Sequence, residues 1–509
     1  MLDVFPLRTV FKLDKSRLSI LFYPLALLSI KHRGPIYIWK WAIIFGEIFQ
    51  FVGALIRSEP AISRGFFVKP RTSRYFGKCM RVSLKIWSIS SLIILANAAN
   101  AHELRTKLGL EIERTDNAAL VSDDLKAKDL KSAPSLAIDY QLTFATVDAS
   151  LRYAANTEKY HDETFDNRTE ILGSGDVKWT ILPQKLFWNF FQNRNRLQIN
   201  PQDSRSPDNE TVRDVLRLGP TLQFNLSGNS TLQLDTNFVR NSFELETLLD
   251  SRINQYAIDF DQSLGAQLNW GVDFSYKAVS FDDPRLNYDN QRGGVNFSGS
   301  GRKYNYEITI GRNVINRDLG ESVSGLYFSA VGSLVSSANS TWQFWANKEL
   351  TDSSIGLGLN QNVSDSYNNG DTNFSDNDIV KRSRYEISYT RSLLDRLVKA
   401  NLSVFYDQQD FQILTKDATT LGGRLTLRYQ WSPRLNLVYW FNWQDEDFEL
   451  PARGADSSIT RMNRAEARYA LTRKANVAFW ISDNTRSSLV GLLNEYEKFT
   501  TGITFTYEF

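Results

Sequence analysis

The sequence has little of what most enzymes and soluble multidomain proteins use to build active sites and cores. It contains one cysteine and three histidines in 509 residues, and its mean hydropathy is −0.34. One cysteine excludes an internal disulfide framework, and the low hydropathy disfavours a bundle of apolar helical spans. Aromatic residues are nonetheless frequent, at 13% of the chain. This combination is typical of a membrane β-barrel, whose strands alternate apolar and polar side chains.

Basic residues are in the minority over most of the chain. From His102 onward 53 Asp and Glu residues outnumber 44 Lys and Arg, whereas the segment before Met80 is basic. Neutralising the phosphates of a nucleic acid requires a basic surface, so the net-acidic body argues against nucleic acid as a partner.

Residues 80–101 have the composition of a targeting segment. They read MRVSLKIWSISSLIILANAANA, with a basic start, an apolar centre and small residues at the end. This order is typical of a secretory signal peptide. We expect cleavage between Ala101 and His102, with Ala98 or Ala99 as the alternative.

Residues 1–79 precede this signal peptide, which normally opens a chain. One explanation is a misplaced start, with Met80 as the true initiator. The other is a cytoplasmic or inner-membrane extension, because Ile36–Ile56 nearly reaches spanning length, although two charged residues within it weaken this interpretation. The only cysteine, Cys79, lies in this extension, so the mature chain would carry no thiol into the oxidising periplasm.

Beyond the signal peptide, hydrophobicity alternates with a period of two in segments of roughly ten residues. In residues 103–114, ELRTKLGLEIER, every second residue is Leu, Thr or Ile, and the positions between them are mostly charged. Side chains alternate across a strand, so one face is apolar and the other polar. About 20 such segments predict an all-β fold over residues 102–509, a transmembrane antiparallel up-and-down β-barrel of 18–20 strands.

Short turns and long polar segments alternate between these strands, as in outer-membrane barrels with periplasmic turns and external loops. The pattern predicts an integral protein of a Gram-negative outer membrane, with the lipid of that membrane as its surroundings. The expected external loops are 115–133, 156–168, 198–211, 240–252, 280–290, 313–322, 348–381, 408–418, 444–460 and 482–497.

The C-terminus alternates aromatic and aliphatic residues up to its last position. Ile503, Phe505, Tyr507 and Phe509 share one face of the final strand. A terminus of this kind resembles the strand that the barrel assembly machinery reads in outer-membrane proteins. We therefore predict these four residues as the assembly signal and the assembly machinery as a partner.

No motif for catalysis or for cofactor binding is present after the signal peptide. The two histidines are His102, at the expected new N-terminus, and His161, in an acidic loop segment. Haem-attachment motifs, glycine-rich phosphate loops and paired metal-binding histidines are all missing from the sequence. We predict no catalytic residue, no metal site and no cofactor.

The longest expected loop, 348–381, leaves two questions open. It gathers Asp365, Asp371, Asp376 and Asp378 among Asn, Ser and Gly, an oxygen-rich set that could hold Ca²⁺ or could simply be solvated. Its length would also allow it to fold into the lumen as a constriction.

The same alternation predicts which charged residues face the lumen. Two interpretations of these residues remain open. They could form a ladder of salt bridges that stiffens the wall, or a basic track that faces an acidic wall across a wet lumen. The basic track comprises Arg384, Lys399, Arg424, Arg428, Arg464 and Arg468, interspersed with Glu386, Asp407 and Glu466, and the acidic wall comprises Asp235, Asp259, Asp261 and Asp273, with Lys277.

Several segments resemble a known family, the outer-membrane proteins associated with PEP-CTERM/exosortase sorting systems and exopolysaccharide gene clusters. They are KWTILPQKLFWNF with Trp179, Pro183 and Trp188, the Gly219-Pro220 pair, the segment KELTDSS, and the terminus TGITFTYEF. The resemblance covers most of residues 102–509 and not the segment before Met80. It implies a role in exopolysaccharide or cell-envelope export, with export components as partners and without catalytic residues.

Three other functions are possible alternatives to a conduit or scaffold for export. A general or substrate-specific porin fits the same lumen. A sheath for an electron-transfer partner fits the fold but has no sequence feature of its own. An outer-membrane hydrolase is disfavoured by the scarcity of histidine.

Overall fold

The structure, a computed structural model, describes residues 102–199, 204–245, 249–352, 378–394, 397–412, 417–450, 454–489 and 495–509. The upstream extension 1–79, the signal peptide 80–101 with Ala101, and residues 353–377 of the longest expected loop lie outside the described residues. No helix in the described part of the chain is long and apolar enough to span a membrane.

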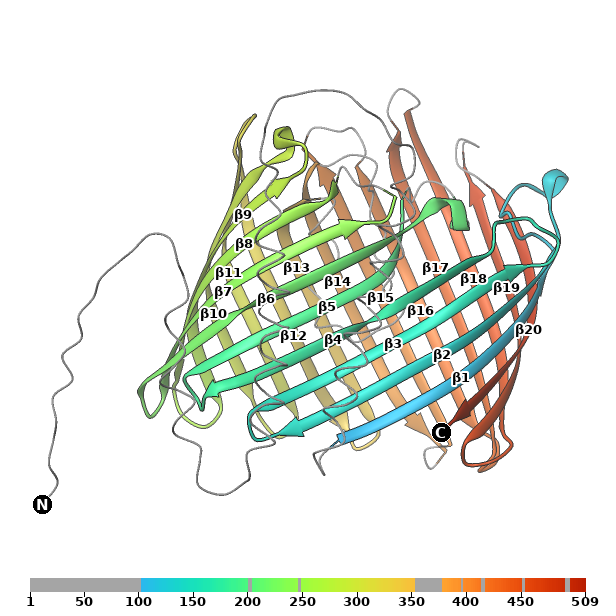
Figure 1. Cartoon of the computed structure of the whole chain (residues 1–509), viewed down its shortest axis with the longest axis horizontal. Coiled ribbons are helices and arrows are strands. Elements are labelled where there is room, and N and C mark those ends of the chain that lie inside the picture. The colour runs from blue at the N-terminus through green and yellow to red at the C-terminus, as the bar shows by residue number, and fades with distance from the viewer. Residues whose placement is uncertain are drawn as a thin grey trace, which may run out of the picture. The chain divides into compact units, whose positions relative to one another are not determined.

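Residues 102–509 form one antiparallel sheet of 20 strands that closes on itself (Figure 1). Each strand pairs with the next along the chain, and β1 also pairs with β20, so that Leu110 lies opposite Phe505 at the seam. Closure leaves no edge strand whose backbone groups lack partners. The predicted fold class is therefore confirmed, at the upper end of the predicted strand number.

The strands are longer than their apolar alternation suggested. They are β1 (His102–Thr115), β2 (Asp129–Phe144), β3 (Val147–Tyr160), β4 (Arg168–Leu182), β5 (Leu186–Gln198), β6 (Glu210–Ser227), β7 (Ser230–Phe243), β8 (Ser251–Ser263), β9 (Leu268–Phe281), β10 (Tyr288–Ser300), β11 (Tyr304–Arg317), β12 (Val323–Ser337), β13 (Ser340–Asp352), β14 (Ile379–Leu393), β15 (Val398–Phe411), β16 (Ala418–Gln430), β17 (Leu435–Leu450), β18 (Gly454–Ala470), β19 (Ala475–Ser488) and β20 (Tyr496–Glu508).

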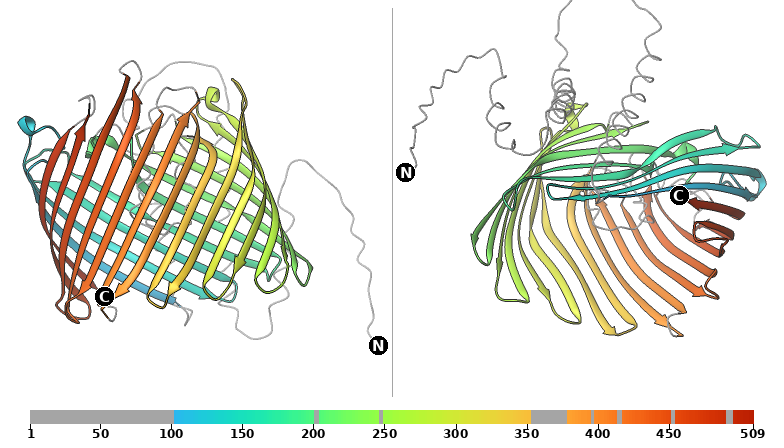
Figure 2. Two further views of the ribbon diagram at one scale, coloured as in Figure 1. Left: turned by 180° about the vertical axis from the view of Figure 1, so that it is seen from behind. Right: turned by 60° about the horizontal axis from the view of Figure 1, so that its bottom comes forward.

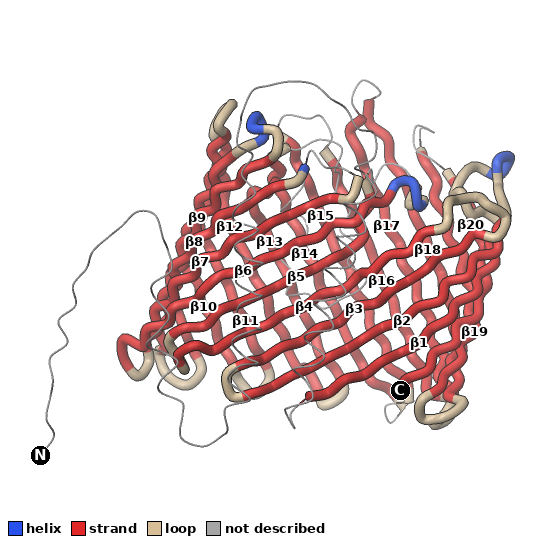
Figure 3. Tube along the Cα trace, viewed as in Figure 1, coloured by secondary structure: helices blue, strands red, loops and turns tan. Residues whose placement is uncertain are grey.

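The two ends of the barrel differ in the length of their connections. At one end, called the turn end here, strands are joined by two to four residues, and at the other, the loop end, most connections are longer. Short 3-10 helices lie in connections at the loop end, among them η2 (Asp123–Leu125), η3 (Pro207–Asn209) and η5 (Pro284–Leu286) (Figure 3). The strands are strongly tilted in every view (Figures 1 and 2), as closure of a sheet requires.

One expected loop is almost entirely strand. Residues 444–460 were expected to form a loop, but β17 runs to Leu450 and β18 begins at Gly454, with register pairs throughout. Here Asp445 and Asp447 are outward while Glu446 is inward, so neither face is apolar and the alternation disappears. The backbone ladder continues because its hydrogen bonds do not depend on an apolar face.

The Gly219-Pro220 pair interrupts one ladder within β6. Both residues pair with β5, whereas the ladder between β6 and β7 passes from Leu218 directly to Thr221. Proline has no N–H to donate, and a Cβ at Gly219 would lie 1.8 Å from the carbonyl oxygen of Thr236. Glycine is therefore required here by the close approach of β7.

A charged lumen within the barrel

Large apolar side chains on the outer face are exposed. On β1, Leu104, Leu108, Leu110 and Ile112 are each between 39% and 49% exposed, and lipid-facing side chains of this kind recur on the other strands. A closed barrel with an apolar exterior of this extent is stable only when lipid surrounds it. The protein is an integral outer-membrane β-barrel. Its loop end is external and its turn end periplasmic, as in other barrels of this membrane.

All six residues of the basic track lie on the lumen side of β14, β15, β16 and β18. In register, Arg428 faces Lys399, and Arg464 faces the inward Trp440. Their neighbours Leu402, Leu427 and Tyr469 are exposed on the lipid side. The ladder therefore places the basic residues on one stretch of the lumen wall.

Half of the track is neutralised by carboxylates. Arg384 lies 3.5 Å from Glu386 and 3.6 Å from Asp407, and Arg464 and Arg468 share Glu466 at 3.4 and 2.6 Å. The side chain of Glu466 is only 4% exposed, so it depends on these partners for compensation of its buried charge.

The other half has no carboxylate partner among the described residues. Lys399 and Arg428 are exposed to the lumen and lie opposite each other, so two like charges meet on adjacent strands. Arg424 stacks on the ring of Phe405, 4.5 Å from its centroid. Positive charge is thus concentrated toward the periplasmic half of β15 and β16.

The four residues of the acidic wall lie together on β7, β8 and β9. Asp259 lies opposite Asp273 in register, and Asp235 accepts hydrogen bonds from Thr221 and Gln233. Asp273 has a cation close by, since Arg292 lies 3.6 Å from its carboxylate. In a ring of 20 strands, β7–β9 and β15–β18 are about half a circumference apart, so the two walls face each other across the lumen.

A polar cavity of about 910 Å³ opens along the acidic wall at the turn end. Its lining includes Asp259, Asp261 and Glu307, together with serine, asparagine and glutamine side chains and no basic residue. Glu307 on β11 and Arg292 on β10 were not among the predicted lumen residues, although the alternation along both strands places them on the inward face. Among the described residues, no group of three or more His, Cys, Asp or Glu could hold a metal ion.

At the loop end, an apolar cluster of buried side chains lies on the inward face of the wall. Every strand from β6 to β14 contributes to it, with Val215, Ile315 and Leu350 each at most 2% exposed. The end of β13 packs inward on β11, where the side-chain amide of Asn313 donates to the carbonyl of Leu350 at 2.7 Å.

The prediction that Asp378 belongs to a solvated or calcium-binding loop is wrong, because its side chain is buried in an ion pair. Its side chain is 1% exposed and pairs with Arg317 of β11 at 2.9 Å. The ends of β13 and β14 that flank residues 353–377 are therefore anchored inside the barrel. The expectation that the loop itself constricts the pore lies outside the described residues.

Breaking this pair is expected to destabilise the barrel. Asp378→Asn should lower the free energy of unfolding by about 3–5 kcal/mol, because it leaves the guanidinium of Arg317 buried without its carboxylate. Urea unfolding in lipid vesicles, followed by tryptophan fluorescence, measures the change. Glu103→Gln removes an exposed pair with Arg105 and should change little. Equal effects of the two variants would contradict the buried role of Asp378.

A second ionic cluster at the loop end was missed because its residues fall within or beside expected loops. Arg196 of β5 lies 2.7 Å from Glu170 and 3.4 Å from both Glu158 and Glu210. Arg168 of β4 pairs with the last two carboxylates as well. The network ties β3 to β6 above the apolar band.

His161 has a partner that the sequence did not indicate. Its Nε2 lies 3.0 Å from the hydroxyl of Ser132, and both side chains are near the external surface. A serine nucleophile also needs an orienting acid and an oxyanion site. Among the described residues, no acidic side chain partners the second ring nitrogen of His161.

The four residues of the assembly signal lie at the seam where the barrel closes. Ile503, Phe505 and Tyr507 pair with β1 and β19 on the lipid side. The backbone N–H of Phe509 donates to the carbonyl of Thr106 at 2.9 Å, and its ring is 60% exposed. The last side chain is thus available to another protein, while its backbone completes the ladder.

No protein-family model and no curated protein matches the sequence. Several solved structures align with it at low similarity. The FrpB iron transporter from Neisseria meningitidis (F3-3 variant) aligns over 82% of each chain, with 11% identity and a TM-score of 0.40. OpdO from Pseudomonas aeruginosa aligns over 81% of this chain and 98% of its own, with 10% identity and a TM-score of 0.36. OccAB3 from Acinetobacter baumannii aligns over 80% and 100%, with 9% identity and a TM-score of 0.37. Similarity at this level assigns neither a family nor a solute to this chain.

Proposed function

We propose that the barrel is a passive, non-enzymatic outer-membrane channel whose lumen favours anionic or acidic sugar-like solutes. The observation that carries this proposal is the set Lys399, Arg424 and Arg428, which face the lumen without carboxylate partners among the described residues. The acidic wall lies across the lumen from them. Opposed charges of this kind orient a charged or polar solute as it passes.

The process that the channel serves is proposed to be export of exopolysaccharide or other cell-envelope material, as a conduit or as a scaffold for export components. Support comes from the resemblance of segments such as KWTILPQKLFWNF and TGITFTYEF to proteins of exosortase-associated gene clusters. A porin for small solutes is the alternative. Loss of surface polysaccharide in a deletion strain, with uptake of small solutes unchanged, would separate export from a porin role.

Blockade of single-channel current tests the solute preference. Oligogalacturonate should block current through the purified barrel at about tenfold lower concentration than a neutral malto-oligosaccharide of equal length, because only the acidic sugar is attracted by the basic track. The difference should shrink as salt is raised, since exposed charges are screened over about 10 Å at 0.1 M ionic strength. Equal blockade by the two sugars would contradict the proposal.

A further inference from the structure

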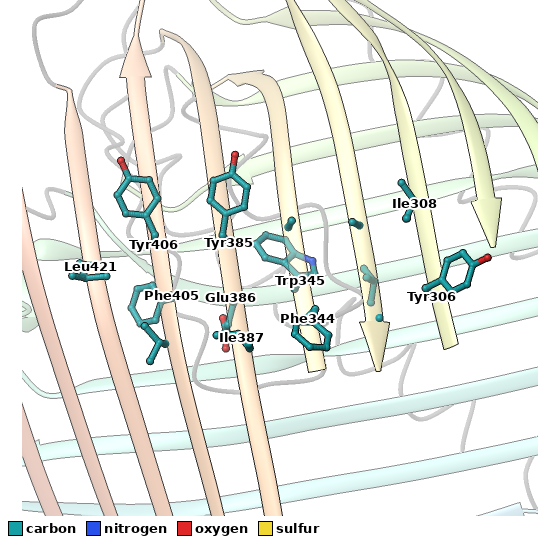
Figure 4. A pocket seen from close by; sticks show the side chains of 15 residues that line it. Tyr306, Ile308, Phe344, Trp345, Tyr385, Glu386, Ile387, Phe405, Tyr406 and Leu421 are labelled. Carbon is teal, nitrogen blue, oxygen red and sulfur yellow. The ribbon is translucent and has the colours of Figure 1, made fainter. Parts of the chain in front are cut away.

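A groove of about 540 Å³ lies on the lipid-facing side of β11–β16. Its floor is made by three small residues, Ala330, Gly332 and Ala346. Its walls are larger side chains of the flanking strands, among them Phe344 and Tyr385, which are 44% and 43% exposed (Figure 4). The groove is hollow because small side chains on β12 and β13 lie between aromatic ones.

The strand registers show that the groove belongs to the outer face. Ile308, Ala330 and Ala346 lie directly opposite one another on β11, β12 and β13. The row continues through Tyr385 and Tyr406 on β14 and β15, whose rings stack with centroids 6.4 Å apart. Most of the residues that line the groove therefore lie on the outer face, and lumen-side residues such as Trp345 and Phe405 alternate with them along the same strands, so the groove opens to the bilayer.

The polar boundary of the membrane begins immediately beyond the groove at its external end. The hydroxyl of Tyr406 donates to the side-chain oxygen of Gln408 at 3.2 Å, and Gln408 in turn donates to Asp410 at 2.9 Å. Tyrosine with an apolar body and a bonded hydroxyl is typical of the interface level. The mouth of the groove thus lies at the headgroups of the outer leaflet.

Two cations border this mouth. Lys348 is two residues beyond Ala346 on the same face of β13, and Arg312 is four residues beyond Ile308 on β11. Arg312 lies opposite Leu326, which is 55% exposed to lipid, and its guanidinium donates to the hydroxyl of Ser324 at 3.2 Å. Both cations are exposed, and neither has a carboxylate partner in the part of the chain that the structure describes.

We propose that this groove and its two cations bind one molecule of the phosphorylated, multiply acylated glycolipid of the outer leaflet, lipopolysaccharide. An acyl chain would lie in the groove, where it gains dispersion contacts that a smooth wall lacks. A phosphate at the headgroup level would lie between Arg312 and Lys348, since guanidinium and ammonium groups are the usual partners of phosphate. Phospholipid of the inner leaflet surrounds the periplasmic end of the barrel, whereas the mouth of the groove and its two cations lie at the external end.

Native mass spectrometry of the folded protein in detergent tests this proposal with purified lipids. The probes are bisphosphorylated lipid A, dephosphorylated lipid A and phosphatidylglycerol of matched chain length. The parent protein should bind bisphosphorylated lipid A about tenfold more tightly than either of the other two. Equal binding of phosphatidylglycerol, or of dephosphorylated lipid A, would overturn the proposal.

Three variants separate the headgroup from the groove. Arg312→Gln with Lys348→Gln should lose about tenfold in affinity for bisphosphorylated lipid A. Ala330→Phe should lose affinity without a change of charge, and Ala346→Leu serves in its place where folding is impaired. The matched control is Arg240→Gln with Arg252→Gln, an exposed pair on the same face and at the same end of β7 and β8 but away from the groove.

The control variant should bind as the parent does. An equal loss of affinity in the control would show that any exposed cation at this level attracts the lipid, without a specific site. Full binding by the variant that lacks Arg312 and Lys348 would show that these two cations do not hold the headgroup, and would also overturn the proposal. Folding of every variant is confirmed beforehand by heat-modifiable migration in electrophoresis. The outcome is independent of channel activity, because the groove and the lumen lie on opposite sides of the wall.

Discussion

Replacing Lys399, Arg424 and Arg428 with glutamine is expected to shift the reversal potential of the channel toward cation selectivity. These three side chains have no carboxylate partner in the described part of the chain, and their removal leaves the acidic wall to dominate the local potential. In a tenfold salt gradient the shift should be about 10 mV or more, against a limit of about 59 mV for a perfectly selective pore.

The matched opposite variant replaces Asp259, Asp261 and Glu307 with Asn, Asn and Gln. Because these carboxylates line the cavity across the lumen, their loss should shift the reversal potential toward anion selectivity. Two shifts of opposite sign would be difficult to obtain from a general disturbance of the barrel. If the reversal potential is unchanged in both variants, these residues do not set the selectivity of the channel and serve a structural role.

Arg464 and Arg468 are excluded from that experiment for a physical reason. Both lie against Glu466, whose side chain is 4% exposed, so removing both guanidinium groups would leave a buried carboxylate without compensation. A lower folding yield would then obscure any change in selectivity. Unpaired residues give the cleaner test because their removal leaves no partner behind.

Phe509→Ala is expected to lower the yield of folded protein in the outer membrane severalfold while refolding from urea into detergent proceeds as for the parent. The substitution keeps the backbone hydrogen bond to Thr106 and removes only a ring that is 60% exposed. That ring contributes little to the stability of the folded barrel, so its loss should mainly weaken recognition by the assembly machinery. Immunoblots of outer-membrane fractions and of refolding reactions measure the two yields.

Phe479→Ala is the control for this prediction. Phe479 is also lipid-facing and 59% exposed, but it lies within β19 rather than at the terminus. Its replacement should leave both yields close to those of the parent. A similar loss in both variants would mean that the terminal aromatic residue carries no special signal.

The fold could be predicted from the sequence because lipid imposes a simple rule on each strand. Residues that face lipid are apolar and their neighbours are polar, as Leu425 and Leu427 show beside Arg424, so the period of two is visible along the whole apolar band. Pairing between neighbouring strands then follows from the short turns.

The ends of the strands could not be predicted in the same way. Above the apolar band both faces of a strand are polar, as at Asp445 and Glu446, and the alternation that marks a strand is lost. The buried pair of Arg317 and Asp378 was hidden for a related reason. Sixty-one positions separate these residues, and only the inward packing of β13 and β14 brings them together.

The lumen was partly predictable. Alternation places Arg428 and Asp259 on the inward face, but it does not show which charges pair. Arg424 stacks on Phe405 of the neighbouring strand, and two arginines of β18 share Glu466. Both contacts depend on where the side chains lie along the barrel axis, which the alternation does not show. The groove on β11–β16 was not predicted at all, because it arises where small residues of adjacent strands coincide.

Conductance of the purified parent protein in a planar bilayer tests the central claim most directly. A channel with a charged lumen should give discrete, voltage-independent current steps in symmetric salt, and a preference for anions in a salt gradient. Folded, membrane-inserted protein without any conductance would contradict the account and indicate that the barrel is a closed scaffold.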